Sequence, residues 1–343
     1  MKLIHKIGGK LYVNPDGLEW KRSKWIKPIQ VYLKYSEKKM AENADLIISD
    51  NQGIEDYLKA EYDHVTSKVI AYGTNDVVMA PGVAQPWLDK YGIQVGAYYL
   101  VVGRFVPENN YEVIIRNFMN SSTTHDLVII TNHLGDPYFE KLRQLTNFDQ
   151  DKRIKFVGTV YDKEQLTAIR KHAFAYIHGH AVGGTNPGLL EAMSVTDLNL
   201  VFDVSFNRNV ALDSALFWQI DTLTEVMSQA EMLKVEAIEG LAKKAKKITI
   251  IILFAQVFLF LIFIDLFCMN KQSIYKNTNK NPSTFVNGFS GAGGGGRTRT
   301  VSLPTDFESV TSANSITPAN QLFYYISIFC KNQEKYYNFV IFP

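Results

Sequence analysis

Short runs of β-branched and aromatic residues alternate with helix-like stretches through the first 247 residues of this chain. The runs predict buried strands at 45–49, 68–73, 98–103, 126–131, 153–158, 174–179 and 198–203. Helical spacing marks the intervening segments 51–62, 109–119, 137–145 and 163–172. Because strands that alternate with helices pair in parallel, the pattern predicts an α/β fold with helices on both faces of parallel sheets.

The length and composition limit the possible classes of protein. A chain of 343 residues is long enough for two domains, and residues 76–87, with two prolines and a glycine, are typical of a linker between them. The formal net charge of +2 argues against a dedicated nucleic-acid binder. The two cysteines, Cys268 and Cys330, predict neither a disulfide framework nor a zinc cluster, and fit a reducing compartment. The first residues contain no run typical of a signal peptide.

Residues 248–268 are almost entirely apolar over about the 20 residues that a bilayer crossing needs. The lysines in 243–247 favour a cytoplasmic side for the start of this segment. Two interpretations stay open, a transmembrane helix and a buried core helix.

The segment 269–343 differs again, since most of it is polar and rich in Gly, Ser, Thr and Asn. This composition predicts disorder. The sequence GAGGGGRTRT (291–300) resembles a fortuitous translation of non-coding DNA. We therefore hypothesise that a frameshift replaced the natural C-terminus near residue 247.

The stretch HGHAVGGTNPGLLEAM (178–193) is predicted to form a glycine loop between a strand and a helix. Pro187 suits the first helical turn, and Thr185 or Asn186 can cap it. The loop amides and the helix N-terminus would then face the carboxyl edge of the sheet, where anions and phosphates bind. The alternative is an ordinary strand-to-helix turn in which Glu191 is solvated.

A second strand, 98–103, also ends in a loop, which begins with Gly103 and Arg104. An arginine in this position can bind a diphosphate with two hydrogen bonds, although a simple surface arginine is the alternative. Two such loops in one α/β unit favour a joint nucleotide-sugar site over either loop alone.

These motifs occur in an order that resembles the C-terminal half of family 4 glycosyltransferases, and more narrowly the bacterial rhamnosyltransferases of capsule and cell-wall polysaccharide assembly. The matching segments are VVGRFVPENNYEVIIRNF (101–118), IITN (129–132), RIKFVGTVYDKEQL (153–166) and the glycine loop. LYVNPDGLEWKRSKW (11–25) and YSEKKMAENADLIISDNQGIEDYL (35–58) are similar to the latter part of the family's N-terminal domain, so the resemblance spans residues 5–235.

The resemblance implies the GT-B fold, in which two Rossmann-like domains face each other across a cleft, and sugar transfer with retention and without a metal or other cofactor. It also shows departures from the wider family. VPENN (106–110) stands where the family has a phosphate-binding lysine. Gly183 stands at the first of two glutamates, the second of which is matched by Glu191, as in the rhamnosyltransferase-like subgroup.

The resemblance also implies a domain organisation. We expect a remnant of the N-terminal acceptor domain at 1–78, a linker at 79–95, a nucleotide-sugar-binding domain at 96–247, a candidate transmembrane helix at 248–268 and a disordered tail at 269–343. The strand and glycine-rich loop that begin a GT-B N-terminal domain have no counterpart before residue 1, and the usual C-terminal helix is missing. We therefore expect a chain that is truncated at the N-terminus and aberrant at the C-terminus.

The expected site residues follow from the motifs and the resemblance together. No catalytic base or nucleophile can be named. Trp20, Trp25 and Arg22 could stack on an acceptor or belong to the core, and His178 is interpreted as structural. The expected donor-binding residues are Gly103, Arg104, Asn132, His180, Gly183, Gly184, Thr185, Asn186 and Glu191, and the expected acceptor-side residues are Asp16 and Gly17.

The sequence thus indicates a retaining glycosyltransferase. It would move a sugar, rhamnose from dTDP-rhamnose, to a lipid-linked saccharide at the cytoplasmic face of the membrane, with residues 248–268 as a membrane anchor. Two alternatives are kept. One is a catalytically inactive remnant that at most binds nucleotide, and the other is a GT-B nucleotide-sugar epimerase.

Overall fold

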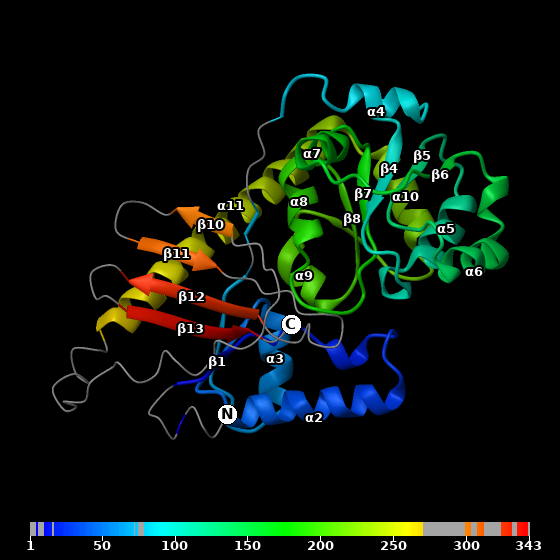
Figure 1. The fold of residues 1–343 in the computed structure, drawn as a ribbon. Coiled ribbons are helices and arrows are strands. Elements are labelled where there is room, and N and C mark those ends of the chain that lie inside the picture. The colour runs from blue at the N-terminus through cyan, green and yellow to red at the C-terminus, as the bar shows by residue number, and fades with distance from the viewer. Residues whose placement is uncertain are drawn as a thin grey trace, which may run out of the picture.

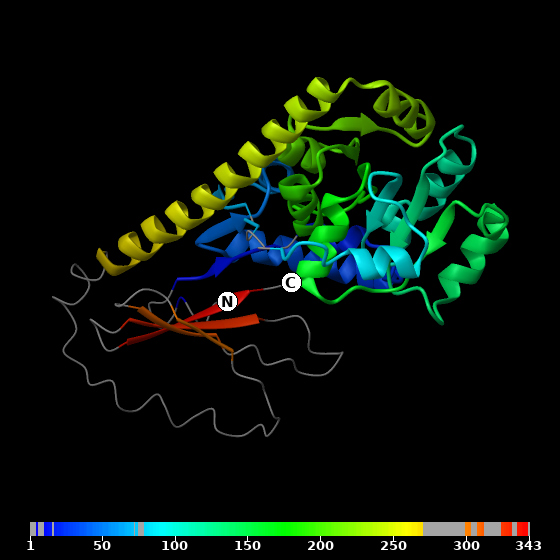
Figure 2. The ribbon, with the colours of Figure 1, turned by 90° about the horizontal axis from the view of Figure 1, so that it is seen from above.

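The structure is a computed structural model that describes residues 5, 10–15, 17–71, 73–74, 79–269, 299–302, 307–311, 324–330 and 335–341. Within these ranges two α/β units lie side by side (Figure 1), and a long helix leads away from the second unit (Figure 2).

The N-terminal unit is a small parallel sheet with the strand order β1-β2-β3. Its core is formed by apolar residues from the strands and two helices, among them Val13, Met40, Ile47, Ile54 and Leu58. The elements are β1 (Tyr12–Val13), η1 (Glu19–Lys21), α2 (Lys27–Asn43), β2 (Leu46–Ser49), α3 (Gln52–Glu61) and β3 (Ser67–Val69).

The second unit is a six-stranded sheet in the order β6-β5-β4-β7-β8-β9, and all of its neighbouring strands are parallel. The predicted parallel α/β fold is therefore confirmed. The strand β9 was not predicted, because its three residues are too short for a clear pattern. The strands are β4 (Tyr98–Val102), β5 (Asp126–Ile130), β6 (Ile154–Phe156), β7 (Ala175–His178), β8 (Asn199–Phe202) and β9 (Leu216–Trp218).

Successive side chains of β4 point to opposite faces of this sheet, so they enter two separate cores. Tyr99 and Val101 pack against α5 (Tyr111–Met119), α6 (Pro137–Thr146) and α10 (Leu223–Met232). On the other face, Tyr98 and Leu100 pack against α4 (Gln85–Lys90), α7 (Lys163–Lys171) and α8 (Pro187–Val195). The remaining helical elements of this unit are η2 (Pro107–Asn109), η3 (Phe148–Gln150) and α9 (Ser205–Ala211).

The expected linker at 79–95 is not simply a connector. It contains α4, and Trp87 and Leu88 of this helix are buried in the core of the second unit. The prolines suggested a break, but Pro86 lies in the first turn of the helix, where a proline is tolerated.

The expected transmembrane segment at 248–268 belongs to a longer helix, and its side chains from residue 254 onward lie outside the described residues. It is the second half of one helix, α11 (Val235–Met269), whose first half covers α8. Ile248 and Ile252 pack against the cluster that contains Leu190 and Val210, and Thr249 is only 3% exposed. In the part of the chain whose side chains the structure describes, which on α11 ends at residue 253, no helix is long and apolar enough to cross a membrane.

The structure describes four strands within the segment 269–343, for which the composition predicts disorder. They form a four-stranded antiparallel sheet (Figure 1) of β10 (Arg299–Ser302), β11 (Phe307–Thr311), β12 (Tyr324–Cys330) and β13 (Lys335–Ile341). The expectation rested on the polar stretch, whereas β12 and β13 are rich in the aromatic and β-branched residues that favour strands. The other residues of the tail lie outside the described residues.

Candidate functional site

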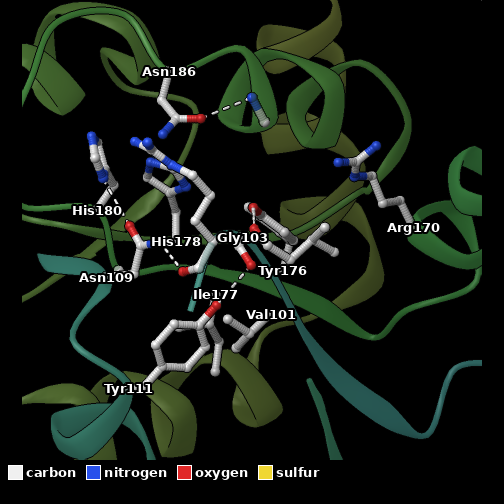
Figure 3. Close-up of a pocket in the computed structure, with 14 residues that line it drawn as sticks. Val101, Gly103, Asn109, Tyr111, Arg170, Tyr176, Ile177, His178, His180 and Asn186 are labelled. Atoms are coloured by element: carbon white, nitrogen blue, oxygen red, sulfur yellow. Dashed lines mark hydrogen bonds between the residues drawn. The ribbon is translucent and has the colours of Figure 1, made fainter. Parts of the chain in front are cut away.

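A pocket opens at the point where the strand order of the large sheet reverses, between β4 and β7. In open α/β sheets, ligands bind in this crevice at the carboxyl ends of the strands. The cavity measures about 260 Å³ and is shown in Figure 3. Its lining comprises Val101, Val102, Gly103, Arg104, Asn109, Tyr111, Arg170, Tyr176, Ile177, His178, Gly179, His180, Asn186 and Gly188.

The loop after β4 supplies one wall of the pocket, and hydrogen bonds fix its start. The Gly103 carbonyl accepts hydrogen bonds from the Tyr111 hydroxyl (3.1 Å) and the Thr131 hydroxyl (2.8 Å). The side-chain amide of Asn109 donates to the Arg104 carbonyl at 2.7 Å. Among the described residues, no carboxylate lies within ion-pair distance of the exposed Arg104 guanidinium. This loop therefore presents a cation to the pocket.

The loop after β7 supplies the opposite wall and approaches the first loop very closely. A Cβ atom at Gly179 would lie 2.2 Å from the Asn109 carbonyl oxygen, so the position requires glycine. Nδ1 of His180 lies 2.8 Å from Oδ1 of Asn109. The side-chain amide of Asn110 donates to the Gly179 carbonyl at 2.9 Å. Hydrogen bonds therefore join the two loops, and Figure 3 shows the one between His180 and Asn109.

Two histidines of this wall are neutral at physiological pH. Burial, reinforced by His180, lowers the pKa of His178 to about 3. Burial and the nearby guanidinium groups of Arg22 and Arg104 lower the pKa of His180 to about 4. The imidazoles can therefore donate or accept hydrogen bonds without adding charge to the pocket.

Two buried nitrogen atoms of pocket residues have no hydrogen-bond partner in the described structure. They are Nε2 of His178 and Nε of Arg170, each from a residue that is only 4% exposed. A buried polar atom without a partner is uncommon in a native protein and calls for an explanation. Because both residues line the pocket, a ligand in the pocket is one explanation.

The glycine loop itself is not the open anion site that the sequence suggested. The backbone N–H of Thr185 donates to Oδ2 of Asp50 at 3.0 Å, and the Thr185 hydroxyl donates to the Asp50 carbonyl at 2.6 Å. At Gly184, a Cβ atom would lie 2.3 Å from Oδ1 of Asp50. A carboxylate of the N-terminal unit therefore occupies the position expected for a ligand, and neither Gly183, Gly184 nor Thr185 lines the pocket.

The helix N-terminus is also partly satisfied from within. Asn186 caps α8 by accepting from the Gly188 amide at 2.9 Å, as predicted for one of two candidate caps, and it lines the pocket. Glu191 lies outside the pocket lining and forms an ion pair with Arg170 at 2.8 Å. Asn132 is exposed and does not line the pocket.

Gly17, one of the two expected acceptor-side residues, lies against the glycine loop. A Cβ atom at Gly17 would be 3.0 Å from the Gly183 Cα, which shows how closely the two backbones approach. Asp16 lies outside the described residues. Within the described part of the chain, no group of three or more His, Cys, Asp or Glu gathers in a way that could hold a metal ion.

The structure adds three residues that sequence reasoning missed, namely Asn109, Arg170 and Asp50. Asn109 belongs to VPENN, which drew attention only for the lysine it lacks. Arg170 lies on α7, a helix that had no apparent link to the site. Asp50 follows β2 directly, and a polar residue at the end of a parallel strand was a usable signal.

Comparison with known proteins shows the fold. A family model described as a domain of unknown function, DUF1972, matches residues 1–75. No curated protein matches the chain. Among solved structures, sucrose-phosphate synthase from Thermosynechococcus elongatus is 15% identical, with a TM-score of 0.64 over 78% of this chain and 70% of that one.

Two further solved structures are similar. HepE from Anabaena, in complex with UDP and glucose, is 13% identical, with a TM-score of 0.62 over 76% of this chain and 73% of that one. A glycosyltransferase from Rickettsia africae ESF-5 is 13% identical, with a TM-score of 0.57 over 81% of this chain and 80% of that one. The chain therefore has the α/β fold of GT-B glycosyltransferases, with its parallel sheets.

Proposed function

We propose that this chain is a glycosyltransferase whose nucleotide-sugar donor binds in the pocket between β4 and β7. One observation carries the proposal: the guanidinium of Arg104 has no carboxylate partner in the described structure and lines the same cavity as the unpartnered buried nitrogens of His178 and Arg170. A ligand with a diphosphate and several hydroxyl groups satisfies all three. The similar HepE structure, which holds UDP and glucose, supports this choice of ligand class.

In the proposed reaction, Arg104 neutralises the negative charge that develops on the leaving diphosphate. The neutral imidazoles of His178 and His180 and the Asn109 amide orient the donor by hydrogen bonds. Glu191 holds the ribose while its ion pair with Arg170 fixes its position. Transfer with retention is proposed from the family resemblance, and no base or nucleophile is assigned.

We propose rhamnose as the sugar and dTDP-rhamnose as the donor. The support is the GGTNP sequence at 183–187, which the rhamnosyltransferase-like subgroup shares. The solved neighbours named with UDP or UDP-glucose make UDP-glucose the most informative competitor.

We propose a lipid-linked saccharide as the acceptor and the cytoplasmic face of the membrane as the site of action. Contact with a membrane surface is supported by Val31 and Tyr32 of α2 and by its N-cap residue Ile26, which are 71%, 63% and 66% exposed. The exposed Lys27 and Lys38 lie on the same helix. Exposed apolar residues beside lysines favour binding to an anionic lipid surface. Co-sedimentation with anionic vesicles tests this, and a Val31→Ser, Tyr32→Ser variant that sediments like the wild type would argue against it.

Calorimetry with dTDP-rhamnose, dTDP and UDP-glucose tests the donor site directly. Saturable binding of the dTDP compounds, with weaker binding of UDP-glucose, is the expected result. Incubation with dTDP-rhamnose and a lipid-linked acceptor then tests transfer. Binding without transfer would favour the inactive remnant, and no binding by a chain shown to be folded by circular dichroism would refute the proposed function.

A further inference from the structure

Two backbone carbonyls at the carboxyl end of β4 accept hydrogen bonds from tyrosines of the same pocket. The Tyr176 hydroxyl donates to the carbonyl of Val102, the last residue of β4, at 3.1 Å. The Tyr111 hydroxyl donates to the carbonyl of the next residue, Gly103, also at 3.1 Å. All four residues line the cavity, so both hydrogen bonds lie in its wall (Figure 3).

Both tyrosines are buried and stay protonated at neutral pH. Tyr176 is 1% exposed and Tyr111 is 0% exposed. Burial raises the pKa of Tyr176 to about 12, and it also raises the pKa of Tyr111. Because a protonated phenol can donate, each hydroxyl directs its proton to the carbonyl oxygen that it contacts.

These two hydrogen bonds change what the wall offers to a ligand. A carbonyl oxygen is an acceptor with a partial negative charge, and the oxygens of a diphosphate are negatively charged acceptors, so the two repel each other at short range. A phenolic proton on the carbonyl reduces this repulsion. The polar atoms without a partner in the described part of the pocket include the nitrogens of His178 (Nε2) and Arg170 (Nε), and the guanidinium of Arg104 lies in the same lining.

We propose that Tyr176 and Tyr111 are positioning residues for the phosphate groups of the ligand. Their hydroxyls neutralise the two carbonyls at the end of β4, so that a diphosphate can lie against this wall beside Arg104. The inference rests on the proposed function for the identity of the ligand, a nucleotide sugar, whereas the role of the hydroxyls requires only a phosphate group.

The substitution Tyr176→Phe tests the proposal, because it removes the hydroxyl and keeps the ring. Calorimetry measures the dissociation constants of inorganic pyrophosphate and dTDP for the wild type and the variant. We expect both ligands to bind roughly fivefold more weakly to Tyr176→Phe, since the uncovered carbonyl repels the phosphates that the two ligands share.

Tyr98→Phe is the matched control. Tyr98 is also 0% exposed and its hydroxyl also donates to a backbone carbonyl, that of Ile169, but neither residue lines the pocket. Urea denaturation should show a similar loss of stability for Tyr98→Phe and Tyr176→Phe. Calorimetry should show that only Tyr176→Phe loses affinity for the two phosphate ligands.

The carbonyl of Gly103 gives a second test, because it has two donors. The Thr131 hydroxyl donates to it at 2.8 Å, in addition to the Tyr111 hydroxyl. Tyr111→Phe and Thr131→Val should each weaken pyrophosphate binding by less than about twofold, since one donor remains. The double variant should weaken it roughly fivefold, more than the product of the two single effects.

The possible results separate this inference from the proposed function. Equal affinities of Tyr176→Phe and Tyr98→Phe would overturn the inference, and so would a loss limited to dTDP, because the tyrosine would then support the nucleoside. Independent effects of Tyr111→Phe and Thr131→Val would overturn the role of Tyr111. In all three cases the donor site stands if the wild type binds dTDP. Pyrophosphate binding that Tyr176→Phe weakens, by a wild type that does not bind dTDP, would refute the proposed donor and support the inference. If the folded wild type binds neither ligand, both fail.

Discussion

The two loops at the carboxyl edge of the large sheet look alike in sequence but differ in what they offer a ligand. Each follows a buried parallel strand and precedes a helix, and each contains glycine and polar residues. The loop after β4 presents Arg104 without a carboxylate partner in the described structure. The loop after β7 has its Thr185 amide engaged by Asp50.

This difference shows that a loop amide is open to an anion only where no internal carboxylate already accepts from it. The Thr185 amide, which directly precedes the N-cap residue Asn186, joins the two units through Asp50. At the N-terminus of α8 itself, Asn186 and Gly188 line the pocket. Among the residues that the structure describes, no carboxylate lies within ion-pair distance of Arg104, which makes it the stronger candidate for binding phosphate.

The close approach of the two loops can be broken at Gly179. The substitution Gly179→Ala would place a methyl group 2.2 Å from the Asn109 carbonyl oxygen, a backbone atom that cannot move away easily. We expect a loss of about 3 kcal/mol in the free energy of unfolding, measured by urea denaturation. Gly240→Ala is the control, because nothing lies within 4 Å of its Cβ position in α11. It should stabilise the protein by roughly 0.5 kcal/mol, and equal effects of the two variants would contradict the assigned role of Gly179.

The substitution Arg104→Ala tests whether the two loops contribute unequally to phosphate binding. Loss of a charged hydrogen-bond donor to a diphosphate costs about 2 kcal/mol, or roughly 30-fold in the dissociation constant of dTDP. Calorimetry measures this effect beside Arg143→Ala, which removes an exposed arginine paired with Glu140 on α6. An unchanged affinity of Arg104→Ala would mean that the diphosphate lies elsewhere.

The sequence predicted the parts of the molecule that depend on local patterns. The strand-helix alternation led to the parallel sheet, and the N-cap of α8 followed from Thr185, Asn186 and Pro187. The partner of the glycine loop could not be predicted in this way, because Asp50 is 135 residues away in the chain from Thr185. Hydropathy also could not show that Ile248 and Ile252 contact α8, since an apolar run looks the same in a lipid bilayer and in a protein core.

The neutral histidine of the second loop predicts a pH dependence of stability. The unfolded His180 side chain takes up a proton below pH 6.5, whereas the folded one, with a pKa of about 4, does not until lower pH. The unfolded state thus binds more protons in this window, and stability falls as the pH decreases from 6.5 to 4. His180→Asn should reduce this slope by about 1.4 kcal/mol per pH unit.

Urea denaturation at several pH values measures the slope. The control is His64→Asn, at an exposed position with a φ of 59°, which asparagine tolerates. Equal slopes for the wild type and His180→Asn would mean that His180 is not held neutral by the loop.

The smallest effect is expected at Glu191, which connects the buried Arg170 with the proposed ribose position. Its side chain is 48% exposed, so water can replace much of the ion pairing with Arg170 that Glu191→Ala removes. We expect a loss of about 1 kcal/mol in stability, since the pair is partly screened, and a roughly fivefold weaker binding of dTDP. Asp197→Ala, which removes the exposed partner of Lys246, is the control for the loss of a surface ion pair. If Glu191→Ala lowers stability but binds dTDP as the wild type does, Glu191 serves only Arg170. The ribose would then have to be held from the β4 loop. In that case the β4 loop would bind both the diphosphate and the ribose, and the two loops would differ more in their contribution to donor binding.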